Sequence, residues 1–138
     1  MQFQTFINAE KYTVVVKIVN PIKEYREEYR NFLKSHNRYI DREIFDEFLN
    51  LYEKQINDIV GIATCNVEAG DIFDEKYGEA LAYERCLKAF ETYRIKMYRM
   101  IEEDFEKVVL AANKKVAVCS KRKTERAERI HAIIAGVS

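Results

Sequence analysis

The longest stretch compatible with a single helix constrains the fold more than any other feature of the chain. It begins at Asp71 and reaches Asn113 without a proline. A forty-residue helix would be roughly 60 Å long, about twice the diameter of a small domain. Apolar residues recur in it every three or four positions, which places them on one helix face: Phe73, Tyr77, Ala80, Leu81, Leu87, Phe90, Met97, Ile101, Phe105, Val108 and Ala112. We therefore expect the far half of this helix to pack on a second copy of the chain.

Composition indicates one folded domain over residues 1–138, divided into residues 1–66, the long helix at 71–113 and a basic segment at 114–138. Hydrophobic residues make up 48% of the chain and charged residues 33%, as in ordinary globular proteins. No run of eighteen apolar residues and no basic leader followed by an apolar run is present, so neither a membrane span nor a secretory signal is expected. Three widely spaced cysteines predict reduced thiols in the cytoplasm.

Two segments near the start of the chain predict a β-hairpin, and a third predicts a further strand. Residues 2–7 and 12–19 are rich in β-branched and aromatic residues, and both faces of the second segment are largely apolar, which favours a central strand. Residues 59–66 form a short apolar run, in which Gly61 suggests a bulge or a close backbone approach. The expected fold class is α+β, with a small antiparallel sheet, two short helices and one long oligomerising helix.

Helix boundaries follow from capping residues. Asn20 and Pro21 predict the start of a first helix, and Asp41 predicts the cap of a second over about residues 42–57, with Ile40 stapled against Phe45. Asp71 is expected to cap the long helix.

Asp74 and Gly78, near the start of the long helix, lead to two further predictions. Asp74 is expected at its third position, and Gly78 suggests that a strand or ligand packs closely there. Beyond Asn113, residues 115–119 either extend the helix or form a fourth strand. A last helix is expected from Ser120 or Thr124 to about Ala135.

The sequence contains no recognisable catalytic or metal-binding motif. His36 and His131 are isolated, no His, Cys and carboxylate group stands at ligand spacing, and Cys65 and Cys86 are most simply small buried residues. No metal, no cofactor and no catalytic residue is predicted. An enzyme that uses the abundant carboxylates stays a third hypothesis, and it would need a pocket in which carboxylates titrate abnormally.

Charge is distributed unevenly although its sum is zero. Residues 61–113 carry eleven acids and seven bases, a net charge of −4, whereas residues 114–138 carry seven bases and two acids, a net charge of +5. The basic segment can bind an anion or nucleic acid, or it can lie along the acidic helix of a partner subunit. Composition alone does not choose between these alternatives.

Charged residues that interrupt the apolar stripe of the long helix mark a second candidate. Glu84 and Arg94 stand at such positions, where a charge must be paired, reach solvent or line a wet cavity. If the cavity lies between subunits, arginines are available for an anionic ligand. The predicted ligand-binding residues are Arg85, Arg94, Arg122 and Arg126 as phosphate partners and Phe73 as a stacking surface.

A short motif at the start of the long helix resembles a pattern in accessory proteins of tailed phages and prophages of Gram-positive bacteria. The motif runs from Gly70-Asp71-Ile72-Phe73-Asp74 through Gly78 and Ala82 to Arg85 and covers some sixteen residues. Proteins of this kind are often inhibitors of host defence. Among them, the Thoeris anti-defence sponges are small α+β oligomers that bind cyclic nucleotide signals without cleaving them, and this chain is similar to them in size and expected architecture.

The resemblance implies a non-enzymatic, cytoplasmic homo-oligomer that counters host defence. Such a protein sequesters a nucleotide-like small molecule or binds a host defence protein. The alternative from a different class is a regulator that binds nucleic acid through the basic segment at residues 114–138, with an affinity that falls steeply with salt.

Overall fold

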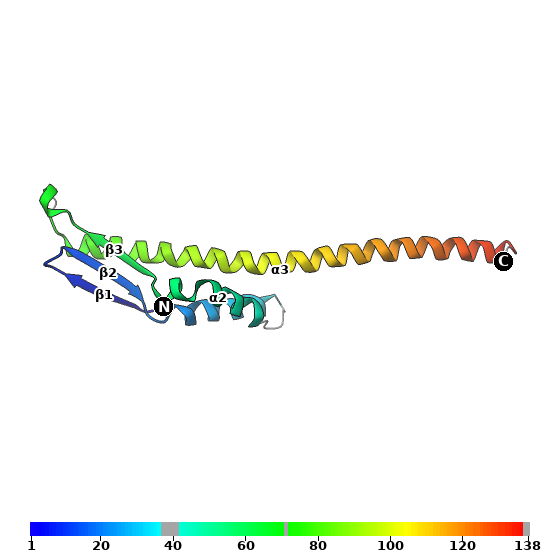
Figure 1. Ribbon diagram of the computed structural model, residues 1–138, viewed down its shortest axis with the longest axis horizontal. Helices are drawn as coiled ribbons and strands as arrows, with labels where there is room; N and C mark the ends of the chain where they lie inside the picture. Colours follow the sequence, from blue (N-terminus) through cyan, green and yellow to red (C-terminus); the bar gives the residue numbers. More distant parts are fainter. Residues whose placement is uncertain (37–41, 71, 137–138) are drawn as a thin grey trace. The chain divides into compact units, whose positions relative to one another are not determined.

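The computed structural model describes residues 1–36, 42–70 and 72–136. Its elements follow in the order β1 (Phe3–Asn8), β2 (Thr13–Ile18), α1 (Pro21–Ser35), α2 (Arg42–Asn57), β3 (Val60–Thr64), a short 3₁₀ turn (Val67–Ala69) and α3 (Glu75–Ile134) (Figure 1). This order and the antiparallel sheet confirm the predicted α+β fold. The chain divides into two compact units, which we call the N-terminal unit (residues 1–100) and the C-terminal unit (residues 101–138).

The sheet of the N-terminal unit has the strand order β1-β2-β3, so β2 is central as predicted. Both pairings are antiparallel, and the ladder aligns Thr5 with Val16 and Val16 with Gly61. Alternate residues of β2 are buried, namely Val14, Val16 and Ile18, and together they define the inner face of the sheet.

The first turns of α3 lie against this inner face, and two glycines permit the approach. A Cβ atom on Gly61 would stand 1.7 Å from the carbonyl oxygen of Ala82 and 2.5 Å from the amide nitrogen of Cys86. The close approach expected at Gly61 is therefore confirmed, and its partner is the backbone of α3. Gly78 faces β2, because a Cβ atom there would lie 3.0 Å from Cγ2 of Val14. A strand, rather than a ligand, packs at this glycine.

Aromatic side chains join α1, α2 and the part of α3 before residue 100. Tyr25 of α1 stacks on Phe90 of α3 with 4.4 Å between ring centroids and meets Phe48 of α2 edge to face at 5.7 Å. Tyr25 and Phe48 are fully buried. The buried residues of α1 include Tyr25, Tyr29 and Leu33, which recur at the spacing of an amphipathic helix. Within the described part of the chain, no helix combines the length and apolar character that crossing a bilayer requires.

Capping at the helix starts differs from the expectations. Asn20 adopts a left-handed conformation (φ 52°) and makes no side-chain cap hydrogen bond, whereas Pro21 occupies the first turn as predicted. α3 begins at Glu75, and Asp74 is its cap rather than its third residue: Asp74 Oδ1 accepts from the amides of Lys76 (3.0 Å) and Tyr77 (3.2 Å). The predicted caps Asp41 and Asp71, and Ile40, lie outside the described residues.

Of the two alternatives for residues 115–119, the structure shows the helical one, since α3 is one helix to Ile134 and no separate last helix begins at Ser120 or Thr124. No glycine or proline occurs between residues 79 and 135, and the segment is rich in Ala, Lys, Arg and Glu, which are strong helix formers. Val116 and Val118 suggested a strand, but a strand also needs a neighbour to pair with. Local helix propensity therefore decides the conformation of residues 114–124.

Candidate functional site

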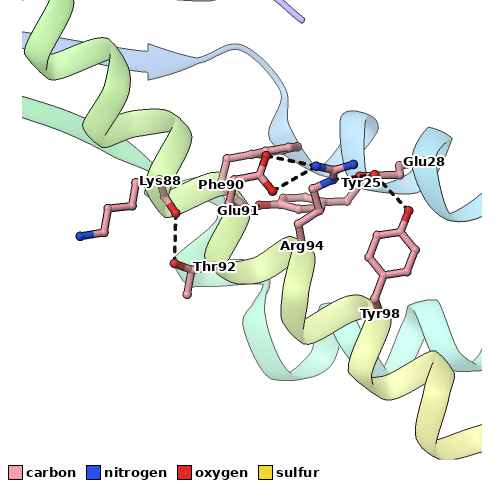
Figure 2. A network of polar contacts seen from close by, with 8 residues as sticks. All are labelled: Tyr25, Glu28, Lys88, Phe90, Glu91, Thr92, Arg94 and Tyr98. Carbon is pink, nitrogen blue, oxygen red and sulfur yellow. Dashed lines mark hydrogen bonds and ion pairs between the residues drawn. The ribbon is translucent and has the colours of Figure 1, made fainter.

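The most connected polar cluster surrounds Arg94 on α3 (Figure 2). Its Nε donates to Glu28 Oε1 of α1 at 2.6 Å, and one guanidinium nitrogen donates to both carboxylate oxygens of Glu91 at 3.0 and 3.1 Å. The hydroxyl of Tyr98 donates to the same Glu28 oxygen at 3.0 Å. The hydrogen bond that Arg94 donates to Glu28 is the main reason that the pKa of Arg94 is raised. The positive charge of Arg94 is therefore balanced within the chain.

Tyr25, next to this cluster, and Cys86, where α3 packs on the sheet, are both held in their neutral forms. The Tyr25 hydroxyl donates to the carbonyl oxygen of Phe90 at 2.7 Å (Figure 2), and burial raises the pKa of Tyr25 above its ordinary value. Burial likewise raises the pKa of the Cys86 thiol. A buried, protonated thiol is a poor nucleophile, so the geometry gives Cys86 a packing role.

Phe73 lines a cavity of about 300 Å³ between the end of β3 and the start of α3. Its ring meets Tyr12 edge to face at 5.8 Å, and Asp74 and Tyr77 line the same cavity. The Asp74 carboxylate already accepts the amides of the first turn of α3, which are the groups that bind anions at a helix start. The cavity is thus aromatic and mildly acidic, which suits an apolar group better than a phosphate.

Arg85 lies on α3 beside the open edge of β3. Its guanidinium donates to the carbonyl oxygen of Ile62 at 2.7 Å. A carbonyl at a sheet edge is otherwise available to another strand, so this contact shields the edge. Glu84, which was also singled out from the sequence, is exposed and does not face the packed side of α3.

The five predicted ligand-binding residues occupy separate environments. Phe73 lines the cavity, Arg85 contacts β3, and Arg94 contacts Glu28 and Glu91. Arg122 and Arg126 are exposed residues of the C-terminal unit. No group of His, Cys, Asp and Glu side chains able to hold a metal occurs among the described residues.

An apolar surface on the C-terminal unit emerges as the largest unexplained feature. From residue 106 to residue 134, every residue except Glu125 and Ala132 is exposed. Every third or fourth residue is nevertheless apolar, apart from one lysine, and we call this set the C-terminal stripe: Phe105, Val108, Ala112, Val116, Cys119, Lys123, Ala127, Ile130 and Ile134. The sequence analysis recognised this stripe as far as Ala112. Its continuation through Val116 and Cys119 was missed because the conformation of residues 115–119 was left open between helix and strand.

Comparison of the chain with protein families, with curated proteins and with solved structures finds no match.

Proposed function

We propose that this chain is a non-enzymatic binding protein that works as a homo-oligomer, with the C-terminal stripe as the surface through which the copies assemble. The observation that carries the proposal is the exposure of apolar side chains at helical spacing, with Val108 57% and Val116 64% exposed. A solvated helix of this length gains most of its stability from packing an apolar face. A contiguous exposed apolar surface is typical of a protein interface.

In this proposal the target is a host defence protein in the cytoplasm, and the protein acts as a phage-type accessory protein that counters host defence. The short motif that ends at Arg85 supports this class of activity. A protein target is favoured over a nucleotide-like signal because Arg85 and Arg94 are already engaged by Ile62, Glu28 and Glu91. Sequestration of a nucleotide-like molecule would have to use the Phe73 cavity.

Native mass spectrometry and light scattering of the purified chain test the assembly. We expect an oligomer in the wild type and in Leu110→Asp, because Leu110 is exposed but lies on the helix face opposite the stripe. Val116→Asp should weaken assembly at least about 100-fold, since each copy loses an apolar contact and gains a charge at the interface. A monomeric wild type, or equal effects of the two substitutions, would contradict the proposal.

The same spectra distinguish the targets. Protein isolated from defence-active cells should carry no releasable small molecule if its target is a protein. A bound mass of a few hundred daltons per site would replace the protein target with a nucleotide-like ligand.

Nucleic-acid binding is the second candidate, and the exposure of the basic residues of the C-terminal unit favours it. All seven bases after Asn113 are exposed: Lys114, Lys115, Lys121, Arg122, Lys123, Arg126 and Arg129. Binding to duplex DNA and to RNA, measured by fluorescence anisotropy across salt concentrations, should show a steep loss of affinity as several counterions are released. Salt-insensitive or undetectable binding would eliminate this candidate.

A further inference from the structure

We propose that two copies of the chain pair antiparallel along the C-terminal stripe, with the two-fold axis near Lys114. The inference rests on the proposed self-assembly and adds its orientation and register. It uses residues of the C-terminal unit alone.

The spacing of the stripe is the first support. Its steps of four, three and four residues repeat every eleven residues, from Ala112 to Lys123 and from Lys123 to Ile134. Eleven residues correspond to three turns of nearly 3.67 residues each, a period with which a stripe follows a partner helix in a right-handed supercoil. A stripe with this period stays on one face of α3 throughout residues 105–134.

The part of the stripe from Phe105 to Lys123 is also symmetric about Lys114, so that an antiparallel partner meets this part layer by layer. A residue that lies n positions before Lys114 in one copy faces the residue that lies n positions after Lys114 in the other copy. This rule places Ala112 opposite Val116, Val108 next to Cys119, and Phe105 opposite Lys123 of the other copy. Two of these layers join a smaller side chain to a larger one, and the layer of Val108 and Cys119 joins two side chains of moderate size, so the layers can fill the space between the helices without crowding.

Lys123 is the one charged residue of the stripe, and it distinguishes the two orientations. A parallel pair in register would place the two Lys123 side chains against each other between the helices, so that their positive charges would repel. In the antiparallel pair, Lys123 lies across Phe105, where its apolar stem can cover the ring while its ammonium group reaches solvent. The antiparallel orientation therefore avoids this repulsion.

The charges beside the stripe favour the same orientation. Residues 102–106 carry four acids and no base, and the antiparallel register sets them against residues 122–126, which carry three bases and one acid. A parallel pair would instead set the acidic segments against each other and the basic segments against each other. Opposite charges across an interface fix orientation and register more than they add affinity.

A particular contact follows from this register. Asp104, Arg122 and Arg126 lie on the same side of the stripe, because each immediately precedes a stripe residue in the chain and is rotated from it in the same direction around the helix axis. In an antiparallel pair, residues on the same side of each stripe meet. Asp104 of one copy is then bracketed by Arg122 and Arg126 of the other, one helical turn apart. The two arginines are accordingly assigned to the partner subunit's acidic segment.

Cysteine cross-linking tests the orientation, because the stripe contains the exposed Cys119. In the antiparallel pair the two Cys119 residues are about 15 Å apart along the axis, too far for a disulfide, whose Cα atoms lie within about 7 Å. Position 108 of one copy, by contrast, lies beside Cys119 of the other. The test compares wild type, Val108→Cys and the control Leu110→Cys, each oxidised mildly and analysed on non-reducing gels with peptide mapping.

We expect Val108→Cys to form a disulfide between position 108 and Cys119 at least about tenfold faster than Leu110→Cys, because the pair raises the effective thiol concentration. Wild type should form no comparable dimer. A rapid Cys119–Cys119 disulfide in the wild type would overturn the antiparallel pairing while leaving the proposed assembly intact. Equal cross-linking of Val108→Cys and Leu110→Cys would overturn the register, and a monomer in native mass spectrometry would overturn both proposals.

Discussion

The two halves of α3 carry the same kind of apolar stripe in opposite environments. Before residue 100, Ala82, Cys86 and Met97 are at most 1% exposed, because the sheet, α1 and α2 supply neighbours for that face. After residue 105, Val116 is 64% exposed although it stands at the same helical spacing. Periodicity therefore identifies which face of a helix must pack, but it does not identify what covers that face.

The difference has a consequence for stability measurements. All nine tyrosines precede residue 100 and the chain has no tryptophan, so intrinsic fluorescence reports on the N-terminal unit alone. The effects of substitutions in the two halves of α3 can thus be distinguished: fluorescence-detected unfolding reports on the N-terminal unit, and oligomer mass reports on assembly.

The largest effect is expected at Gly61. Gly61→Ala places a Cβ atom against the backbone of α3, which cannot move aside without separating the helix from the sheet. We expect unfolding of the N-terminal unit to become easier by about 3 kcal/mol or more, measured by denaturant titration with tyrosine fluorescence. Gly78→Ala is the control, because its nearest neighbour is a side chain and the helix gains about 1 kcal/mol from alanine. Similar losses in both variants would contradict the close approach at Gly61.

A matched pair of truncations on α3 sharpens the comparison. Met97→Ala should lower the free energy of unfolding of the N-terminal unit by roughly 3 kcal/mol, because it opens a cavity at a buried position. Val116→Ala should change it by less than about 0.5 kcal/mol at high dilution, yet weaken assembly by about tenfold. If Val116→Ala destabilised the N-terminal unit as much as Met97→Ala, the two halves would not be energetically distinct.

A smaller effect is expected at Tyr25. Tyr25→Phe removes the hydrogen bond to the Phe90 carbonyl and should cost about 1–2 kcal/mol at neutral pH. Because the folded state raises the pKa of Tyr25, the unfolded chain loses this proton near pH 10 while the folded chain keeps it. The stability that Tyr25 contributes is thus present below about pH 10 and falls as the pH rises above that value.

Denaturant titrations between pH 8 and pH 11 check this dependence. The midpoint of the wild type should fall more steeply above pH 10 than that of Tyr25→Phe, with exposed Tyr77→Phe as the control. Parallel pH profiles for wild type and Tyr25→Phe would contradict the assigned role of burial.

Much of the N-terminal unit was predictable from local patterns. The β-branched residues and two apolar faces of residues 12–19 indicated the central strand, and capping residues indicated the two short helices. As expected, α1 begins at Pro21 and α2 spans residues 42–57. These signals are local, since the period of a strand or helix is written in neighbouring residues. The exception was the end of α3, where β-branched Val116 and Val118 suggested a strand that the continuous helix excludes.

The candidate site was less predictable because its contacts join residues that are distant in the chain. Arg94 stood out as a charge within an apolar stripe, but its partner Glu28 is sixty-six residues earlier in the chain and no spacing rule connects them. The same holds for Arg85, whose partner is a backbone carbonyl of β3. The five residues chosen from local sequence patterns therefore occupy separate environments, and their proposed ligand roles stay predictions.

By itself, the sequence determined the three strands, the two short helices and where the acidic and basic segments lie. Its prediction for the packed face of α3 was wrong at Tyr77 and Ala80, which are exposed. Only the tertiary structure decided that α3 packs against the sheet through Gly61, that Asp74 caps α3, and that Arg94 is neutralised by Glu28. It also decided that the apolar face of α3 is covered before residue 100 and exposed after residue 105. The physical reason is that secondary structure follows from periods of two to four residues, whereas burial and ion pairing depend on residues that are distant in the chain.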